Sequence, residues 1–120
     1  MKTIIAGSRS IKDRKLVERA IKESGFKITR IASGTATGVD KLGEQWAARK
    51  GIEVNLFPPK WIKYGKGAGP IRNQEMADWA DALILIFDGQ SKGSLSMLSI
   101  AREAGLKIHV LNTGDKNGTA

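Results

Sequence analysis

Residues 82–87 read ALILIF, six consecutive apolar residues. A strand with one face in water alternates apolar and polar residues, and this run shows no alternation. Such a run is typical of a central strand in a parallel sheet, which helices cover on both faces. This feature restricts the chain to folds in which a parallel sheet lies between two layers of helices.

Four further β-rich runs alternate with segments of helical periodicity; the runs cover residues 3–6, 28–32, 52–57 and 107–111. Helices are expected around residues 16–21 and 39–47, at about 70–80 and at about 94–104. Five strands alternating with four helices predict an α/β fold, a Rossmann-like three-layer α/β/α sandwich of about five parallel strands.

The length of 120 residues and the absence of a compositional seam predict a single domain over residues 1–111. Residues 112–120 are rich in Gly, Asn, Thr and charge, so we expect a flexible tail. No apolar run approaches the roughly 18–20 residues of a membrane span. The N-terminal MKTIIAGSRS is interpreted as a first strand and not as a signal peptide, because Arg9 and Lys12 follow the apolar stretch. A cytoplasmic protein without membrane partners is expected.

The chain has no cysteine and a single histidine, His109, which excludes disulfides, thiolate chemistry and a His/Cys zinc site. No metal site is predicted. The net charge of +8, from 20 Lys and Arg against 12 Asp and Glu, favours anionic partners. Phosphate-bearing ligands, nucleic acid and simple solubility all remain compatible with this charge.

Three loops rich in Gly, Ser and Thr follow predicted strands, at residues 7–10, 33–40 and 88–94. In an open parallel sheet, ligands bind beyond the carboxyl ends of the strands. Glycine permits close approach of the backbone, and free N–H groups at a helix start attract anions. A single loop of this kind is more often an ordinary turn with a helix cap, but three at one edge favour a phosphate or ribose site. The absence of GxxxxGK[ST] and GxGxxG argues against a kinase or an ordinary dinucleotide dehydrogenase.

The third predicted strand is followed by a long loop, residues 57–69, and long loops in compact domains are often functional. Trp61 and Tyr64 can stack on a base, with Lys60, Lys63 and Lys66 close enough to meet phosphates. Equally, Trp61 can pack against the edge of the sheet while the lysines face water.

The segment KGAGPIRNQEM, residues 66–76, is interpreted as a helix start with Gly69 as N-cap and Pro70 at the first helical position. Arg72 and Asn73 then lie in the first turn, where the helix dipole disfavours a cation by up to about 1 kcal/mol. Either Arg72 pairs with Glu75 or turns into water, or an anion held by Arg72, Lys66 and the free N–H groups removes the conflict.

Several segments together resemble the SLOG superfamily, most closely the branch of small proteins related to YspA and cpYpsA. They are GSR, SGTATGVDxLxxxWA, FPxxWxxYGKxAGPIRNxxM and the buried strand before GxxxGS, and the resemblance covers about residues 2–111. The resemblance implies a Rossmann-like fold and a nucleotide or ADP-ribose-like ligand. Its relatives include LOG-type phosphoribohydrolases, DprA-like proteins that bind single-stranded DNA, and sensor domains for nucleotide-derived signals.

The loops and the resemblance together predict the ligand-binding residues, which come from four loops at one edge of the sheet. They are Gly7, Ser8, Arg9, Ser33, Gly34, Thr35, Gly38, Asp40, Trp61, Lys66, Arg72, Asn73, Gly89, Gly93 and Ser94.

Two departures from the family patterns bear on catalysis. SGTA replaces the HGGA-type loop common in this branch, and Met97 falls where the LOG-type pattern PGGxGTxxE has its glutamate. A thioether cannot serve as a general base. Asp40 and Glu75 are the remaining, weak catalytic candidates, although Asp40 also suits a helix cap or a ribose hydroxyl, and Glu75 can pair with Arg72.

The preferred function is therefore binding, for sensing or sequestering, of a nucleotide or a nucleotide-derived phosphate compound. The alternatives are an N-glycosidic hydrolase or transferase acting on a nucleoside phosphate, and DprA-like binding of single-stranded nucleic acid. A homo-oligomer is also expected, with Met76, Trp79, Met97 and Ile100 buried against a second subunit.

Overall fold

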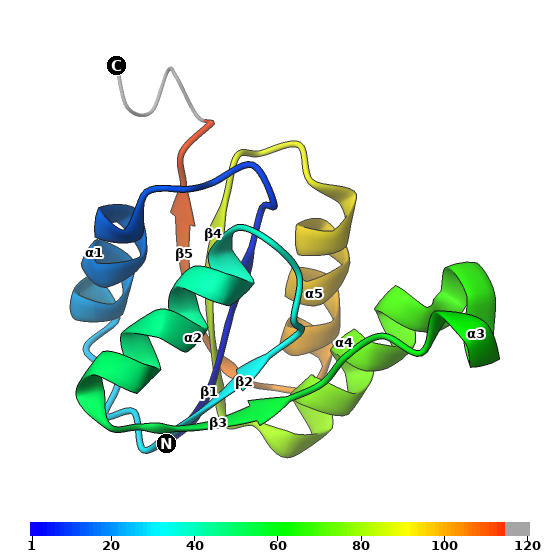
Figure 1. Cartoon of the computed structure of the whole chain (residues 1–120), viewed down its shortest axis with the longest axis horizontal. Helices are drawn as coiled ribbons and strands as arrows, with labels where there is room; N and C mark the ends of the chain where they lie inside the picture. Colours follow the sequence, from blue (N-terminus) through cyan, green and yellow to red (C-terminus); the bar gives the residue numbers. More distant parts are fainter. Residues whose placement is uncertain (115–120) are drawn as a thin grey trace.

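The computed structural model describes residues 1–114, in which strands alternate with helices (Figure 1). In chain order the elements are β1 (Lys2–Gly7), α1 (Arg14–Ser24), β2 (Arg30–Ser33), α2 (Val39–Lys50), β3 (Glu53–Leu56), α3 (Trp61–Tyr64), the 3-10 helix η1 (Gly65–Gly67), α4 (Ala68–Trp79), β4 (Ala82–Phe87), α5 (Lys92–Glu103) and β5 (Lys107–Asn112). The strands form a five-stranded parallel sheet in the order β3-β2-β1-β4-β5. The predicted Rossmann-like α/β fold is confirmed. Within the described range, no helix is long and apolar enough to cross a membrane.

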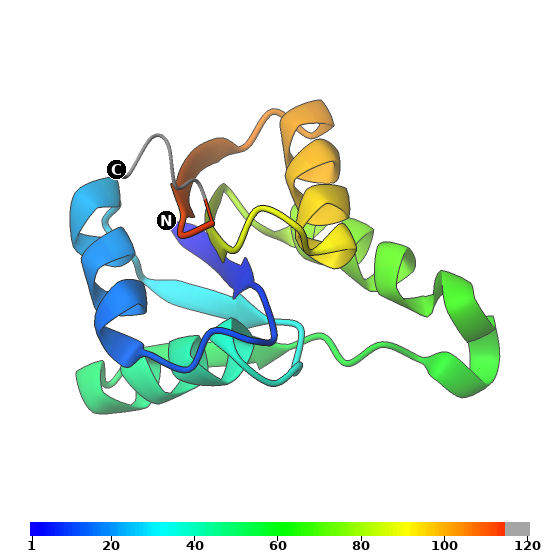
Figure 2. The ribbon, with the colours of Figure 1, turned by 90° about the horizontal axis from the view of Figure 1, so that it is seen from above.

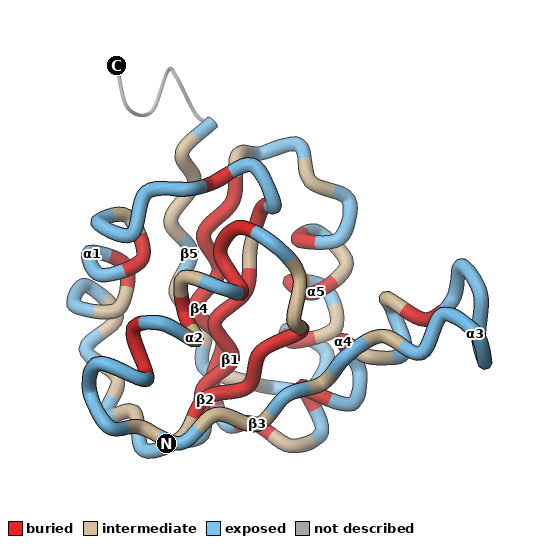
Figure 3. Tube along the Cα trace, viewed as in Figure 1, coloured by how far each residue is buried: buried red, intermediate tan, exposed pale blue. Residues whose placement is uncertain are grey.

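Helices cover both faces of the sheet, with α1 and α2 on one face and α4 and α5 on the other (Figures 1 and 2). The strand β4 lies between β1 and β5 and is buried along its whole length, as its unbroken apolar sequence predicts (Figure 3). Leu83 and Leu85 belong to the core against α4 and α5, whereas Ile84 and Ile86 belong to the core against α1 and α2. The side chains of β4 therefore take part in both cores. Burial of each such side chain contributes about 1.5–3 kcal/mol.

Local signals define the helices of the first face. Asp13 is the N-cap of α1, and its carboxylate accepts a hydrogen bond from the amide of Lys15 at 2.9 Å. Both α1 and α2 end at a glycine in the left-handed region, Gly25 and Gly51, each with φ of 68°.

The segment from residue 57 to the start of α4 differs from the prediction of a plain loop. It contains α3 and η1, and Figures 1 and 2 show α3 projecting from the body of the protein beyond the start of α4. Helix α4 begins at Ala68 with Gly67 as its N-cap, two residues earlier than predicted. Pro70 still fits, because the first turn of a helix has no backbone partner for its N–H groups. The expectation that Arg72 lies in the first turn is wrong, since it lies in the second.

The four residues expected to form a subunit interface pack against the core of the chain itself. Met76 and Met97 are 1% and 2% exposed and belong to the core between the sheet, α4 and α5. Trp79 and Ile100 are partly buried against the same core. These side chains are used within one chain, because α4 and α5 pack against each other as well as against the sheet.

The last strand continues one residue past its predicted end, to Asn112, and the amide of Thr113 donates to the carbonyl of Phe87. The rest of the tail expected to be flexible, residues 115–120, lies outside the described residues.

We predict that Gly7→Ala lowers the free energy of unfolding by about 3 kcal/mol, the upper range for overpacking a core. A methyl group at Gly7 would overlap the carbonyl oxygen of Ile86 on the adjacent strand and crowd Val39. Chemical denaturation measures the loss. Gly93→Ala is the matched control, since a methyl group there meets open space, and equal losses in the two variants would contradict the account.

Candidate functional site

The site lies where the direction of the chain across the sheet reverses. From β1 the chain passes to α1 on one face, whereas from the adjacent β4 it passes to α5 on the other face. The two loops therefore diverge and leave a crevice at the carboxyl ends of β1 and β4, the position at which open α/β sheets bind ligands. A cavity of about 400 Å³ occupies this crevice, here called the main cavity.

The main cavity brings together eight of the predicted ligand-binding residues. They are Gly7, Ser8, Arg9, Asp40, Arg72, Asn73, Gly93 and Ser94. Sequence reasoning missed Ser10 and Ser91, which also line it, and the apolar Met76 and Met97. The signal for Ser91 was its position before a predicted helix, where serine is a favoured N-cap.

Hydrogen bonds join the two loops at the mouth of the crevice. The amide of Ser8 donates to the carbonyl of Ile86 at 3.1 Å, and the amide of Asp88 donates to the Ser8 hydroxyl at 3.0 Å. The carboxylate of Asp88 accepts from the amides of Gln90 and Ser91 and from the Ser10 hydroxyl. These hydrogen bonds lower the pKa of Asp88, with the amide of Gln90 as the largest cause. Asp88 thus serves as a turn residue that fixes the loop.

The N-terminus of α5 opens onto the main cavity. Ser91 is its N-cap and accepts a hydrogen bond from the amide of Ser94 at 3.2 Å. The amides of Lys92 and Gly93 are at the first two helical positions, where the helix itself offers no partner. Together with the helix dipole, these amides favour an anion at this wall.

The side chain of Ser94 brings a buried polar group to the same wall of the cavity. Ser94 lines the main cavity and is 4% exposed, yet its hydroxyl has no hydrogen-bond partner among residues 1–114. A buried hydroxyl without a partner costs about 1–3 kcal/mol. A ligand group in the cavity would supply the missing hydrogen bond.

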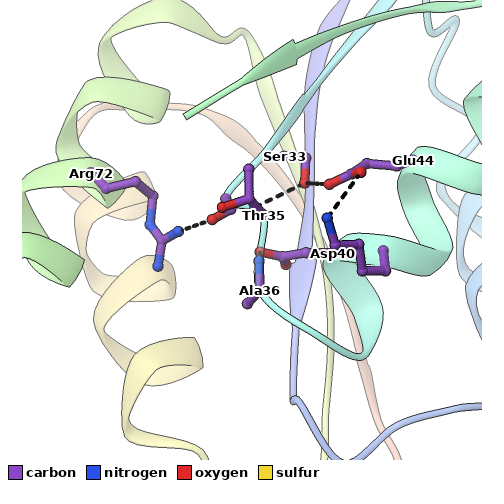
Figure 4. A network of polar contacts seen from close by, with 8 residues as sticks. Ser33, Thr35, Ala36, Asp40, Glu44 and Arg72 are labelled. Atoms are coloured by element: carbon purple, nitrogen blue, oxygen red, sulfur yellow. Dashed lines mark hydrogen bonds and ion pairs between the residues drawn. The ribbon is translucent and has the colours of Figure 1, made fainter. Parts of the chain in front are cut away.

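Arg72 reaches the cavity from the second turn of α4 (Figure 4). Its Nε donates to the side-chain oxygen of Asn73 at 2.9 Å, and its Nη1 donates to the carbonyl of Gly34. The remaining guanidinium N–H groups donate no hydrogen bond within residues 1–114. Burial lowers the pKa of Arg72, partly offset by the charge of Asp40, but the group stays protonated at neutral pH. Arg72 does not pair with Glu75, which is exposed on α4.

Asp40 is a buried carboxylate without an ion-pair partner in the described range. It is 5% exposed and accepts one hydrogen bond, from the amide of Ala36 at 3.1 Å, which ties the preceding loop to α2 (Figure 4). Burial raises its pKa to about 6, and the nearby charges of Arg72 and Arg9 offset this only in part. The expected role as a helix cap is wrong, because Gly38 is the N-cap of α2.

The loop between β2 and α2 is held by side chains that do not line the main cavity. The hydroxyl of Ser33 donates to Glu44 and accepts from the amide of Thr35 (Figure 4). Thr35 adopts φ of 67°, an unusual value for a residue other than glycine. Gly38, with φ of 78°, leaves no room for a side chain because Ser8 and Arg9 lie against it. Ser33 and Gly38 thus shape the loop and line neither the main cavity nor the one beside it.

Other predicted residues lie outside the main cavity. Lys66 is exposed in η1, Gly89 forms a turn with φ of 87°, and Glu75 faces solvent. None of these three lines the main cavity or the cavity beside it. The structure thus places Lys66 outside the cavity that contains Arg72, and their joint binding of one anion stays a prediction. Gly34, Thr35 and Trp61 line the second cavity, which adjoins the first.

No group of three or more metal-ligating side chains occurs within the part of the chain that the structure describes. The site therefore consists of hydroxyls, amides, two arginines and two carboxylates above an apolar floor.

Comparison with models of protein families shows which family the chain belongs to. The model of the YspA, cpYpsA-related SLOG family matches residues 1–64, more than half of the sequence. The chain belongs to this family. The match contains β1, β2 and the loops that follow them, which form one side of the site. The predicted resemblance to SLOG proteins is confirmed.

Among solved structures, DNA processing protein A (DprA) from Streptococcus pneumoniae is similar to this SLOG chain, with a TM-score of 0.74 and 22% identity. The similarity covers 98% of this chain and 52% of that one, so the chain spans about half the length of DprA. At this identity the likeness establishes the shared fold. No curated protein matches the chain.

We predict that Asp40→Asn raises the free energy of unfolding by about 2 kcal/mol at pH 7.5. Between pH 4 and pH 6 the unfolded carboxyl is ionised while the native one is still protonated, so wild-type stability falls as pH rises through this window. The asparagine variant lacks this loss. Denaturation of the wild type and the variant at pH 4 and pH 7.5 measures the gain in free energy of unfolding. An equal gain at the two pH values would contradict the raised pKa.

Proposed function

We propose that this SLOG protein binds a nucleotide or a nucleotide-derived phosphate compound in the main cavity, for sensing or sequestering. The observation that carries the proposal is the buried, unpartnered hydroxyl of Ser94 at the N-terminus of α5, inside a cavity that also contains Arg72. A phosphate oxygen at this wall would accept from Ser94 and from the free amides beside it.

The charges of the cavity fit a ligand that has both phosphate and hydroxyl groups. Arg9 and Arg72 supply cations, and Arg9 takes part in no hydrogen bond or ion pair within residues 1–114. Asp40 accepts one hydrogen bond from the described residues, so its carboxylate retains capacity for the hydroxyls of a ribose. The side chains of Ser8, Ser10 and Ser91 add hydroxyl groups to the lining of the cavity.

The floor of the cavity favours binding over LOG-type hydrolysis. Met97 is 2% exposed and lines the cavity, and Met76 lies beside it. A thioether offers neither a general base nor a charge to stabilise an oxocarbenium-like centre. Apolar side chains here instead give van der Waals contact to a bound sugar or base.

We predict that Ser94→Ala weakens binding of the best nucleotide about tenfold, because a charge-assisted hydrogen bond is lost. The same variant keeps or gains stability, since the buried hydroxyl has no partner in the free protein. A thermal-shift panel of nucleotides and sugar phosphates identifies the ligand, and titration calorimetry measures the affinity.

Arg72→Ala is expected to weaken binding at least tenfold, through loss of a cation at the cavity. Lys66→Ala is the matched control: it removes one positive charge from η1, outside the cavity, and leaves the affinity unchanged. A panel in which no phosphate compound shifts the melting temperature would refute the proposal. Equal losses in Lys66→Ala and Arg72→Ala would show that binding depends only on net charge.

A second candidate function, cleavage of an N-glycosidic bond in a nucleoside phosphate, is favoured by Asp40 alone. Its pKa of about 6 is in the range in which a carboxyl acts as a general acid or base at neutral pH. Chromatography of nucleoside monophosphates incubated with the protein tests it. Release of free base by the wild type and loss of this release in Asp40→Asn would support it, whereas binding without turnover would exclude it.

A further inference from the structure

A second cavity of about 400 Å³ adjoins the main one and has a different lining. The two cavities share Arg9, Ala36 and Arg72, here called the boundary residues. On the far side of the boundary, the loop after β2 supplies Thr35, and the segment after β3 supplies Pro59 and Trp61. The second cavity therefore continues the first across a pair of arginines.

The lining of the second cavity suits a planar, apolar group. Pro58, Pro59 and Trp61 present flat hydrocarbon surfaces, and Trp61 is 50% exposed at the start of α3. The indole lies beside the start of α4, since a Cβ added at Gly69 would be 3.9 Å from its tip. A half-exposed indole at the edge of a cavity can stack on an aromatic ring.

The boundary residues determine what can lie between the cavities. The guanidinium of Arg9 is exposed and makes no hydrogen bond or ion pair among the described residues, and that of Arg72 keeps free N–H groups. The charges of Arg9 and Arg72 repel each other, and the buried Asp40 offsets this repulsion in part. A phosphate between them would relieve the repulsion and accept hydrogen bonds from both.

We propose that the second cavity binds the base of a nucleoside diphosphate, stacked on Trp61, while the phosphates lie at Arg9 and Arg72 and extend into the main cavity. This inference rests on the proposed function and adds to it a direction of binding and a specificity residue. It accounts for the fact that the chain places an aromatic side chain and prolines beside a site built otherwise from hydroxyls and charges.

The test compares ADP with inorganic diphosphate by titration calorimetry, because diphosphate can occupy the boundary and the main cavity without a base. In the wild type, ADP is expected to bind at least tenfold more tightly than diphosphate, since stacking of one base contributes about 1–3 kcal/mol. Trp61→Ala removes this difference and leaves the affinity for diphosphate unchanged. Trp61→Phe, which keeps an aromatic face, retains most of it.

Ile62→Ala is the control for the integrity of α3, because Ile62 is fully exposed next to Trp61 and does not line the second cavity. It is expected to bind ADP as the wild type does.

Equal affinities of the wild type for ADP and diphosphate, or equal losses of affinity for both ligands in Trp61→Ala, would overturn the inference and leave the proposed function standing. A change in oligomeric state of Trp61→Ala with unchanged ADP binding would also overturn it and assign Trp61 to a subunit contact. Failure of diphosphate, ADP and the whole nucleotide panel to bind would refute both proposals.

Discussion

The pairing of β1 with β4 is the constraint on which the site depends. Five residue pairs, from Thr3 with Ala82 to Gly7 with Ile86, align the two strands so that their loops begin at the same level. Gly7 permits the approach because it has no side chain, and the Ser8 hydroxyl then accepts from the amide of Asp88. Because the two strands lead to helices on opposite faces, this alignment also creates the crevice. The contacts that stabilise the β1–β4 pair therefore also shape the proposed site.

Three side chains at the crevice are buried or partly buried without a full set of polar partners among residues 1–114. Asp40 is buried without an ion pair in the described range, Arg72 is partly buried with N–H groups to spare, and Ser94 has a buried hydroxyl without a partner among residues 1–114. Each such group costs free energy in the unliganded protein. All three line one cavity, so a single ligand with phosphate and hydroxyl groups can satisfy them together. Local energetic cost concentrated in this way is typical of a binding site.

The sequence predicts the sheet well, because the unbroken run ALILIF and the alternation of strands and helices leave few other arrangements. It also predicts the loops that approach each other, since the ends of parallel strands meet at one edge. It does not predict the start of α4: Gly69 and Pro70 are good helix-start residues, but α3 and η1 precede them and extend the helix to Ala68. Lys66 accordingly lies in η1 and does not line the cavity. Nor does local pattern reveal that Met76 and Met97 face the core, because this depends on how α4 and α5 pack together.

The most direct test of the central claim, that the carboxyl ends of β1 and β4 form the ligand site, is an amide ¹H–¹⁵N NMR titration with the nucleotide that stabilises the protein best. The account predicts saturable shifts that are largest for Ser8, Arg9, Gly93 and Ser94, with little change in the lysine-bearing outer faces of α1 and α2. Shifts that follow the exposed basic surface, or that leave the amides at the start of α5 unchanged, would contradict it.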